Sequence, residues 1–212
     1  GLVDLGAGKD TLTLSDAGDI VSVANVETLI GGSQADTVTI TTALSQASID
    51  LAAGSDSLTL GNFSNTATVS NTESLLGGTG ADAITLGTAL TTGTTIDLGA
   101  GANTLTLGEF TNTGSVANVD TLIGSTGADT ITFSDAVSAG SINLAAGADK
   151  LRRTVGPQPL KETVADARVN VDCLDVGIGE NHWGRPASTA TYRATERDEV
   201  ALRGDLDSAL LA

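Results

Sequence analysis

Seven glycine-rich segments carry an acidic or amide side chain at the same place, directly before an alternating Thr–Leu or Thr–Ile run. These positions, separated by 26, 20, 26, 21, 26 and 20 residues, are Asp10, Asp36, Asp56, Asp82, Asn103, Asp129 and Asp149. Carboxylates stacked in one column would repel each other by roughly 1 kcal/mol per neighbouring pair in water. A hard dication with oxygen ligands would turn that repulsion into stabilisation. The spacing therefore points to cation binding, with turn hydrogen bonds to solvated aspartates as the alternative.

The segments belong to a longer repeat. Units of about 46 residues open with a variant of D-L-G-A-G at Asp4, Asp50, Asp97 and Asn143. A period of this length is typical of stacked repeat arrays, which present one long surface with repeated chemistry. Such an array favours binding or scaffolding over a single catalytic pocket, and we expect no enzyme activity in these residues.

The local pattern reads as strand, tight turn, strand. Thr-Leu-Thr-Leu alternates with period two, as in a strand with one buried face, and glycine with Asp or Asn suits the turns. We predict an all-β fold, a right-handed parallel β-solenoid (β-roll or β-helix) of about six to seven coils over residues 1–151. Asp16–Val23 and Asn62–Val69 are expected to bulge as inserts. The expected apolar columns are Leu12, Val38, Leu58, Ile84, Leu105, Ile131 and Leu14, Ile40, Leu60, Leu86, Leu107, Phe133.

Composition limits the classes of partner. Residues 1–150 hold sixteen acidic residues against two lysines, a net charge of −14, and the whole chain has 2 % aromatic residues. So few cationic side chains exclude phosphate-driven binding of nucleic acid. No apolar run reaches the ~20 residues that span a bilayer. Without a starting Met or a signal peptide, the segment is expected to derive from a longer polypeptide.

One motif is specific enough to suggest a family. The nonapeptide G-G-x-G-x-D-x-U-x, where U is a large aliphatic residue, is complete at Gly77–Thr85 and nearly complete at Gly31–Thr39 and Gly124–Thr132. It resembles the calcium-binding repeats of RTX (haemolysin-type) proteins, bacterial β-rolls exported by type I secretion. The resemblance departs from the family in its spacing, since RTX motifs usually recur every nine residues, and Asn103 interrupts the acidic series.

The resemblance implies where calcium would bind. In that family, turn carboxylates and glycine carbonyls of successive coils hold Ca²⁺. The matching carboxylates are Asp10, Asp36, Asp56, Asp82, Asp129 and Asp149, with carbonyls near Gly8, Gly32, Gly54, Gly78 and Gly127. A second series, Asp4, Asp50, Asp97 and Asn143, would complete cation sites, cap the strand edge or face solvent.

The strands also carry a Thr-x-Thr pattern. The pairs are Thr11/Thr13, Thr37/Thr39, Ser57/Thr59, Ala83/Thr85, Thr104/Thr106 and Thr130/Thr132. If the aliphatic residues point inward, these hydroxyls form one outward face. Such a face resembles that of ice-binding solenoids, although threonine is also favoured on exposed strand positions generally.

The repeat pattern ends at Leu151, and residues 152–212 read as a separate tail. All seven Arg and all three Pro lie there, as do Cys173 and His182, which are too isolated to indicate catalysis or a zinc site. The tail is expected to cap the solenoid, to carry a secretion signal in Asp205–Ala212, or to be a poorly ordered junction. A helix starting near Thr195, with Leu202, Leu206 and Leu210 on one face, would serve as the cap.

These observations predict a calcium-stabilised structural segment of an exported bacterial surface protein, adhesin or surface layer, secreted or held at the cell surface. Calcium ions are the expected partner, and the solenoid ends are candidates for self-association. Two alternatives stay open. The threonine face predicts an ice-binding solenoid, and the repeats would also serve as the secretion and folding module of a larger RTX-type enzyme or toxin.

Overall fold

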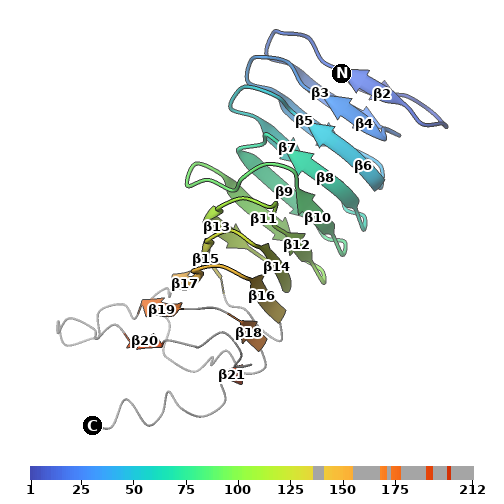
Figure 1. The fold of residues 1–212 in the computed structure, drawn as a ribbon. Coiled ribbons are helices and arrows are strands. Elements are labelled where there is room, and N and C mark those ends of the chain that lie inside the picture. The colour runs from blue at the N-terminus through green and yellow to red at the C-terminus, as the bar shows by residue number, and fades with distance from the viewer. Residues whose placement is uncertain (136–140, 155–167, 171–172, 178–189, 193–199, 202–212) are drawn as a thin grey trace, which may run out of the picture.

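The computed structural model describes residues 1–135 and 141–154, together with 168–170, 173–177, 190–192 and 200–201. These residues form two β-sheets and no helix (Figure 1). The first sheet contains β1 (Leu2–Asp4), β3 (Ile20–Ala24), β5 (Thr37–Ile40), β7 (Ser57–Thr59), β9 (Ser74–Gly78), β11 (Thr95–Gly99), β13 (Thr113–Ala117), β15 (Thr130–Phe133), β17 (Lys150–Thr154), β19 (Cys173–Gly177) and β20 (Ala190–Tyr192). The second sheet contains β2 (Thr11–Thr13), β4 (Thr28–Ile30), β6 (Ser45–Asp50), β8 (Thr66–Ser70), β10 (Ala83–Leu86), β12 (Thr104–Thr106), β14 (Thr121–Ser125), β16 (Ser141–Ala145), β18 (Arg168–Asn170) and β21 (Val200–Ala201).

The chain alternates between the two sheets and advances by one strand in each sheet per turn. Every strand from β1 to β17 pairs in parallel with its neighbours, and seven turns lie between β1 and β15. The coils stack in Figure 1 from the blue N-terminal end to the orange strands. The predicted parallel β-solenoid is therefore confirmed. We call the side where the chain passes from the first to the second sheet the outgoing edge, and the opposite side the return edge.

A thin apolar core fills the space between the sheets. Alternate side chains of each strand point inward, and in the second sheet Ala67, Ile84, Leu105 and Leu122 stack in register, each at most 4 % exposed. Phe133 is the largest fully buried side chain in the described residues. Aliphatic residues suffice because the core is about one side chain deep from each sheet.

The predicted apolar columns mix the two sheets, and this part of the prediction is wrong. Leu12, Ile84 and Leu105 lie in the second sheet, whereas Val38, Leu58 and Ile131 lie in the first. Equivalent positions of successive coils are 17 to 22 residues apart, as the pairs Asp19–Asp36 and Leu90–Asn112 show. A 46-residue unit therefore spans five strands, two and a half turns, so that consecutive units begin in opposite sheets.

The expected inserts are strands. Ile20–Ala24 is β3 and Thr66–Ser70 is β8, and each pairs on both sides. Neither carries the glycine–aspartate motif, so the sequence pattern marked only some of the turns. The true coil is consequently shorter than the spacing of the motifs.

The sheets continue beyond the predicted boundary at Leu151. β17 extends to Thr154, and β18 and β19 add a parallel strand to each sheet. β20 and β21 then pair antiparallel with β19 and β18. Val200–Ala201 is a strand where a helix starting near Thr195 was expected. The rest of the expected helix, the expected secretion signal at Asp205–Ala212 and His182 lie outside the described residues.

Candidate functional site: two side-chain ladders

The structure places the predicted acidic residues on both edges of the solenoid. Asp10, Asp82 and Asn103 lie on the outgoing edge, in the β1–β2, β9–β10 and β11–β12 turns. Asp36, Asp56, Asp129 and Asp149 lie on the return edge, each directly before a strand of the first sheet. The single column predicted from the sequence is therefore wrong, because the half-integral number of turns in each unit sends alternate motifs to opposite edges.

On each edge the side chains form hydrogen bonds from coil to coil. The backbone N–H of Asp36 donates to Asp56 Oδ1 at 2.7 Å, and that of Asp129 donates to Asp149 Oδ1 at 2.9 Å. On the outgoing edge the backbone N–H of Asp82 donates to Asn103 Oδ1 at 2.9 Å. Each side chain thus satisfies a main-chain donor of the preceding coil. We call these series the outgoing and return ladders.

Further members of the ladders were not predicted. Glu27 accepts from the Asp10 N–H at 2.9 Å, and Glu73 accepts from the Asp56 N–H at 2.8 Å. Asn65, Asn112 and Asp120 accept a backbone N–H in the same way, and Asp19 takes part through its own N–H, which donates to Asp36. Most of these residues stand 17 positions from another member, and a search at that spacing would have found them.

Leucines divide each ladder into two runs. Leu44 on the outgoing edge and Leu90 on the return edge donate a backbone N–H to the next coil, at 3.1 Å and 3.0 Å. Their side chains are buried and apolar, so they offer no acceptor to the coil before. The two edges therefore carry the same arrangement of polar runs interrupted by one leucine.

Five aspartates of the ladders are buried. Asp36, Asp56, Asp82, Asp129 and Asp149 are each at most 2 % exposed. Asp36 is well satisfied, because Oδ1 accepts from Asp19 N–H and Oδ2 from Gly32 N–H at 3.0 Å. By contrast, Asp56 Oδ2 and Asp82 Oδ2 are buried with no hydrogen-bond partner. A buried unpartnered oxygen is costly, so these two positions are weak points of the ladders.

Burial affects the acidity of Asp56. Desolvation raises the pKa of its carboxyl above the ordinary value, against the lowering effect of the hydrogen bond from Asp36 N–H. The nearby carboxylates of Glu73 and Asp36 raise this pKa further. Asp56 is therefore flanked by an acidic side chain in the coil on either side and holds its proton more strongly than a free aspartate.

The second acidic series caps the strand ends. Asp4, Asp50 and Asp97 each accept, on Oδ1, the backbone N–H two residues further on. The same oxygen accepts from an asparagine amide of the next coil, for example from Asn71 Nδ2 to Asp50 at 2.7 Å. At Asp4, the hydrogen bond from the Asn25 side chain lowers the pKa of the carboxyl most, and the hydrogen bond from the Gly6 N–H lowers it further. Asn143 Oδ1 accepts from the Ala145 N–H in the same way.

The geometry of the predicted calcium ligands can be compared with the needs of the ion. Calcium takes six to eight oxygen ligands around one point. Within the described residues, no three or more His, Cys, Asp or Glu side chains are grouped as metal ligands. The Gly32 and Gly78 carbonyls accept backbone N–H groups of the next coil. Calcium at these positions, held by carboxylates and glycine carbonyls of successive coils, stays a prediction.

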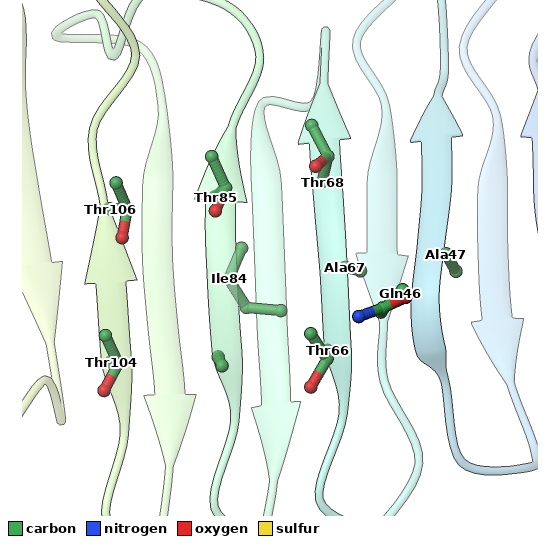
Figure 2. Close-up of a pocket in the computed structure, with 10 residues that line it drawn as sticks. Gln46, Ala47, Thr66, Ala67, Thr68, Ile84, Thr85, Thr104 and Thr106 are labelled. Atoms are coloured by element: carbon green, nitrogen blue, oxygen red, sulfur yellow. The ribbon is translucent and has the colours of Figure 1, made fainter.

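The Thr-x-Thr pairs are also divided between the sheets. Thr37/Thr39, Ser57/Thr59 and Thr130/Thr132 lie in the first sheet, and the remaining pairs lie in the second. In the second sheet, β8 supplies an additional pair that was not predicted, Thr66/Thr68, in register with Ala83/Thr85. Figure 2 shows Thr68, Thr85 and Thr106 in one row with their hydroxyls oriented alike. A shallow groove of about 240 Å³ runs over this face and is lined in part by Thr66, Thr68, Ala83, Thr85, Thr104 and Thr106.

Comparison with known proteins identifies no family. No protein-family model, curated protein or solved structure matches this chain. Among the residues that the structure describes, no helix is long and apolar enough to cross a bilayer. Inferences about function therefore rest on the two ladders and on the outward-facing side chains of the two sheets.

Proposed function

We propose that this chain is a rigid, acidic structural segment of an exported bacterial surface protein. The observation that carries the rigid, structural part of the proposal is the repeated hydrogen bond from a backbone N–H to the Asp, Asn or Glu side chain of the next coil, along both edges. This repetition stiffens a rod without a differentiated site in any one coil. Seven turns at the spacing of β-strands give a length of about 34 Å. Export to a bacterial surface rests on the resemblance of the turn motif alone.

The proposal supplies a reason for the acidic composition. The ladder positions need an acceptor that fits a tight turn, and Asp or Asn meets that need. A net charge of −14 over residues 1–150 also disfavours association between rods, since their surfaces repel. Calcium binding, which the resemblance implies, is the alternative source of cohesion between coils, and melting in EDTA and in calcium distinguishes it from the ladders.

Surface exposure tests the location. Antibodies raised against residues 1–150 should label intact cells of the source organism, and protease treatment of intact cells should remove the label. A cytosolic protein serves as the control for lysis. Labelling that appears only after the cells are opened would contradict export.

A second candidate is ice binding, and the registered threonine rows of the second sheet favour it. The rows repeat at about 4.8 Å along the rod and lie about 7 Å apart. The groove over them is lined by uncharged side chains in an otherwise acidic protein. An ordered hydroxyl array of this kind can match a lattice of water molecules.

Thermal hysteresis tests the second candidate. If the threonine face binds ice, the protein lowers the freezing point below the melting point, and Thr85→Lys removes this effect. Thr37→Lys, at an exposed position of the first sheet, is the matched control and should leave it unchanged. Absence of hysteresis in the unmodified protein would rule out this function.

A further inference from the structure

One asparagine of the solenoid takes no part in the ladders or in the caps of the strand ends. Six asparagines in the described coils donate a hydrogen bond from Nδ2 to a nearby oxygen, and they are Asn25, Asn65, Asn71, Asn103, Asn112 and Asn118. Asn62 differs from them. It is exposed in the turn between β7 and β8, on the outgoing edge, and among the described residues its Nδ2 has no hydrogen-bond partner.

The turn holds Asn62 at its centre. The Phe63 N–H donates to the Gly61 carbonyl at 2.8 Å, which closes a three-residue turn around Asn62. A Cβ on Gly78 of the next coil would lie 2.9 Å from Asn62 Oδ1, so glycine at that position leaves room for the asparagine side chain. The side chain is therefore accessible to another molecule from the edge of the rod.

An equivalent turn shows that this geometry does not need asparagine. Glu109 occupies the same position 47 residues later, in the turn between β12 and β13 on the return edge. There the Phe110 N–H donates to the Gly108 carbonyl at 2.7 Å, so the turn is closed in the same way. Glu109 Oε2 also accepts from Thr126 Oγ1 of the next coil at 3.3 Å, whereas Asn62 makes no such hydrogen bond in the described coils. The fold thus does not require the Asn62 side chain.

Asn62 also begins a tripeptide with a known chemical use. Asn62, Phe63 and Ser64 match the acceptor pattern N-x-[ST] of N-glycosylation, and no other asparagine of the chain is followed by Ser or Thr two positions later. Ser64 is exposed, and within the described part of the chain its hydroxyl makes no hydrogen bond. In the equivalent turn the tripeptide is Glu109–Thr111, which keeps the hydroxyl and lacks the acceptor amide. The β7–β8 turn therefore combines a free amide with a free hydroxyl at the spacing of an acceptor site.

We propose that Asn62 is a site of N-linked glycosylation. The reaction joins Asn62 Nδ2 to the anomeric carbon of a sugar that is carried on a diphosphate, in either a nucleotide or a lipid donor. The new N–C bond forms as the C–O bond to the diphosphate breaks. The diphosphate leaves with the electron pair of that bond, and the amide gives up one proton to a base of the glycosyltransferase. The Ser64 hydroxyl is the group that the transferase recognises.

This inference rests on the proposed export of the chain, because N-x-[ST] acceptors are modified on surface loops of secreted proteins. A glycan is bulky and well hydrated, and so it belongs on the surface of a protein. The β7–β8 turn meets this requirement, since it lies outside both sheets and Asn62 is exposed.

Peptide mass mapping tests the proposal. The full chain is purified from the surface of the source cells and cleaved before its aspartates, which releases Asp56–Ala81 as one peptide. This peptide should be heavier by a whole number of sugar residues, and fragmentation should place the added mass on Asn62. Asn62→Gln and Ser64→Ala should each remove the added mass, whereas Ser64→Thr should keep it. An unmodified Asp56–Ala81 peptide from chain that is exposed on the cells would overturn the proposal and leave the proposed export standing.

The equivalent turn offers a matched gain of a site. Glu109→Asn converts Glu109–Thr111 into an acceptor tripeptide at the same position of the same kind of turn. This variant should carry a second sugar chain, on the return edge. If position 109 stayed unmodified while Asn62 was modified, the argument from the geometry of the turn would be wrong.

A reconstitution distinguishes the two donors and does not depend on export. Unmodified full chain is incubated either with cytosolic extract of the source organism and labelled nucleotide sugars, or with its membranes and labelled lipid-linked sugars. Label should appear on Asn62 in one of the two reactions and be lost in Ser64→Ala. Absence of label from both reactions would contradict the proposal, even if the chain were found only inside the cells and the proposed export had failed.

Discussion

Replacing Asp56 by asparagine should stabilise the protein in the absence of metal. Asp56 and Asn103 are equivalent positions of consecutive units, 47 residues apart. Asn103 accepts the preceding N–H through Oδ1 and uses Nδ2 to donate to the carbonyls of Leu98, Gly99 and Asn118, at 3.3, 3.1 and 3.0 Å. Asp56 accepts the corresponding N–H but has no second partner on Oδ2.

The size of the effect follows from this comparison. A net hydrogen bond contributes about 1 kcal/mol, and a buried unpartnered polar atom costs about 1–3 kcal/mol. Asp56→Asn should therefore raise the free energy of unfolding by about 1–2 kcal/mol. In a protein of this size the melting temperature then rises by about 2–8 °C.

The pH dependence has a definite sign. The folded-state pKa of Asp56 is raised above the ordinary 3.8, so the folded state binds its proton more strongly than the unfolded state. The protonated side chain stabilises the fold relative to the charged one, and this contribution is lost as pH rises through the raised pKa. The advantage of Asp56→Asn should accordingly grow from pH 4 to pH 7.

Thermal melts in excess EDTA at several pH values measure both effects. Asp16→Asn, at an exposed acidic residue, is the matched control and should change stability by less than about 0.5 kcal/mol. A lower melting temperature for Asp56→Asn in EDTA would refute the ladder interpretation. A loss that appears only when calcium is added would instead identify Asp56 as a ligand.

Three further substitutions test the packing of the coils. Gly77→Ala should cost about 1–3 kcal/mol in urea unfolding, because a Cβ there would overlap a carbonyl of the next coil, whereas Gly93→Ala, with its nearest heavy atom at 3.9 Å, should cost little. Asn71→Ala should cost about 2 kcal/mol by the same measurement, because Asn71 has a φ of 52° and donates to Asp50 at 2.7 Å; a neutral result would show that the cap is dispensable. Leu105→Ala, at a fully buried position, should cost about 2–5 kcal/mol in calorimetric melts, and a smaller loss would indicate a core that collapses around the cavity.

The repeat and the strand periodicity predicted the fold class and the approximate number of coils, but not the length of one coil. Thr–Leu alternation and the glycine-rich turns identify strands such as Thr104–Thr106 because inward and outward residues differ in polarity. Ile20–Ala24 and Thr66–Ser70 carry no turn motif, so the sequence pattern did not reveal them as strands. The number of residues in one coil was therefore overestimated. Assignment to a sheet depends on counting every strand, which explains why the predicted columns mixed both sheets.

The predicted site residues lie at equivalent turns, yet their contacts could not be read from their spacing. Whether Asp56 meets an ion or a backbone N–H depends on which coil lies beside it, and that follows only from the 17- to 22-residue turn. Glu27 and Glu73 lie outside the glycine motif and entered the ladders only through the structure.

Circular dichroism of the unmodified protein in excess EDTA, followed by a calcium titration, tests the central claim most directly. If the buried side-chain ladders hold the coils together, the spectrum is β-rich in EDTA and the melting temperature changes little as calcium is added. A coil-like spectrum in EDTA that becomes β-rich with calcium would contradict this account and assign the cohesion of the solenoid to the ion.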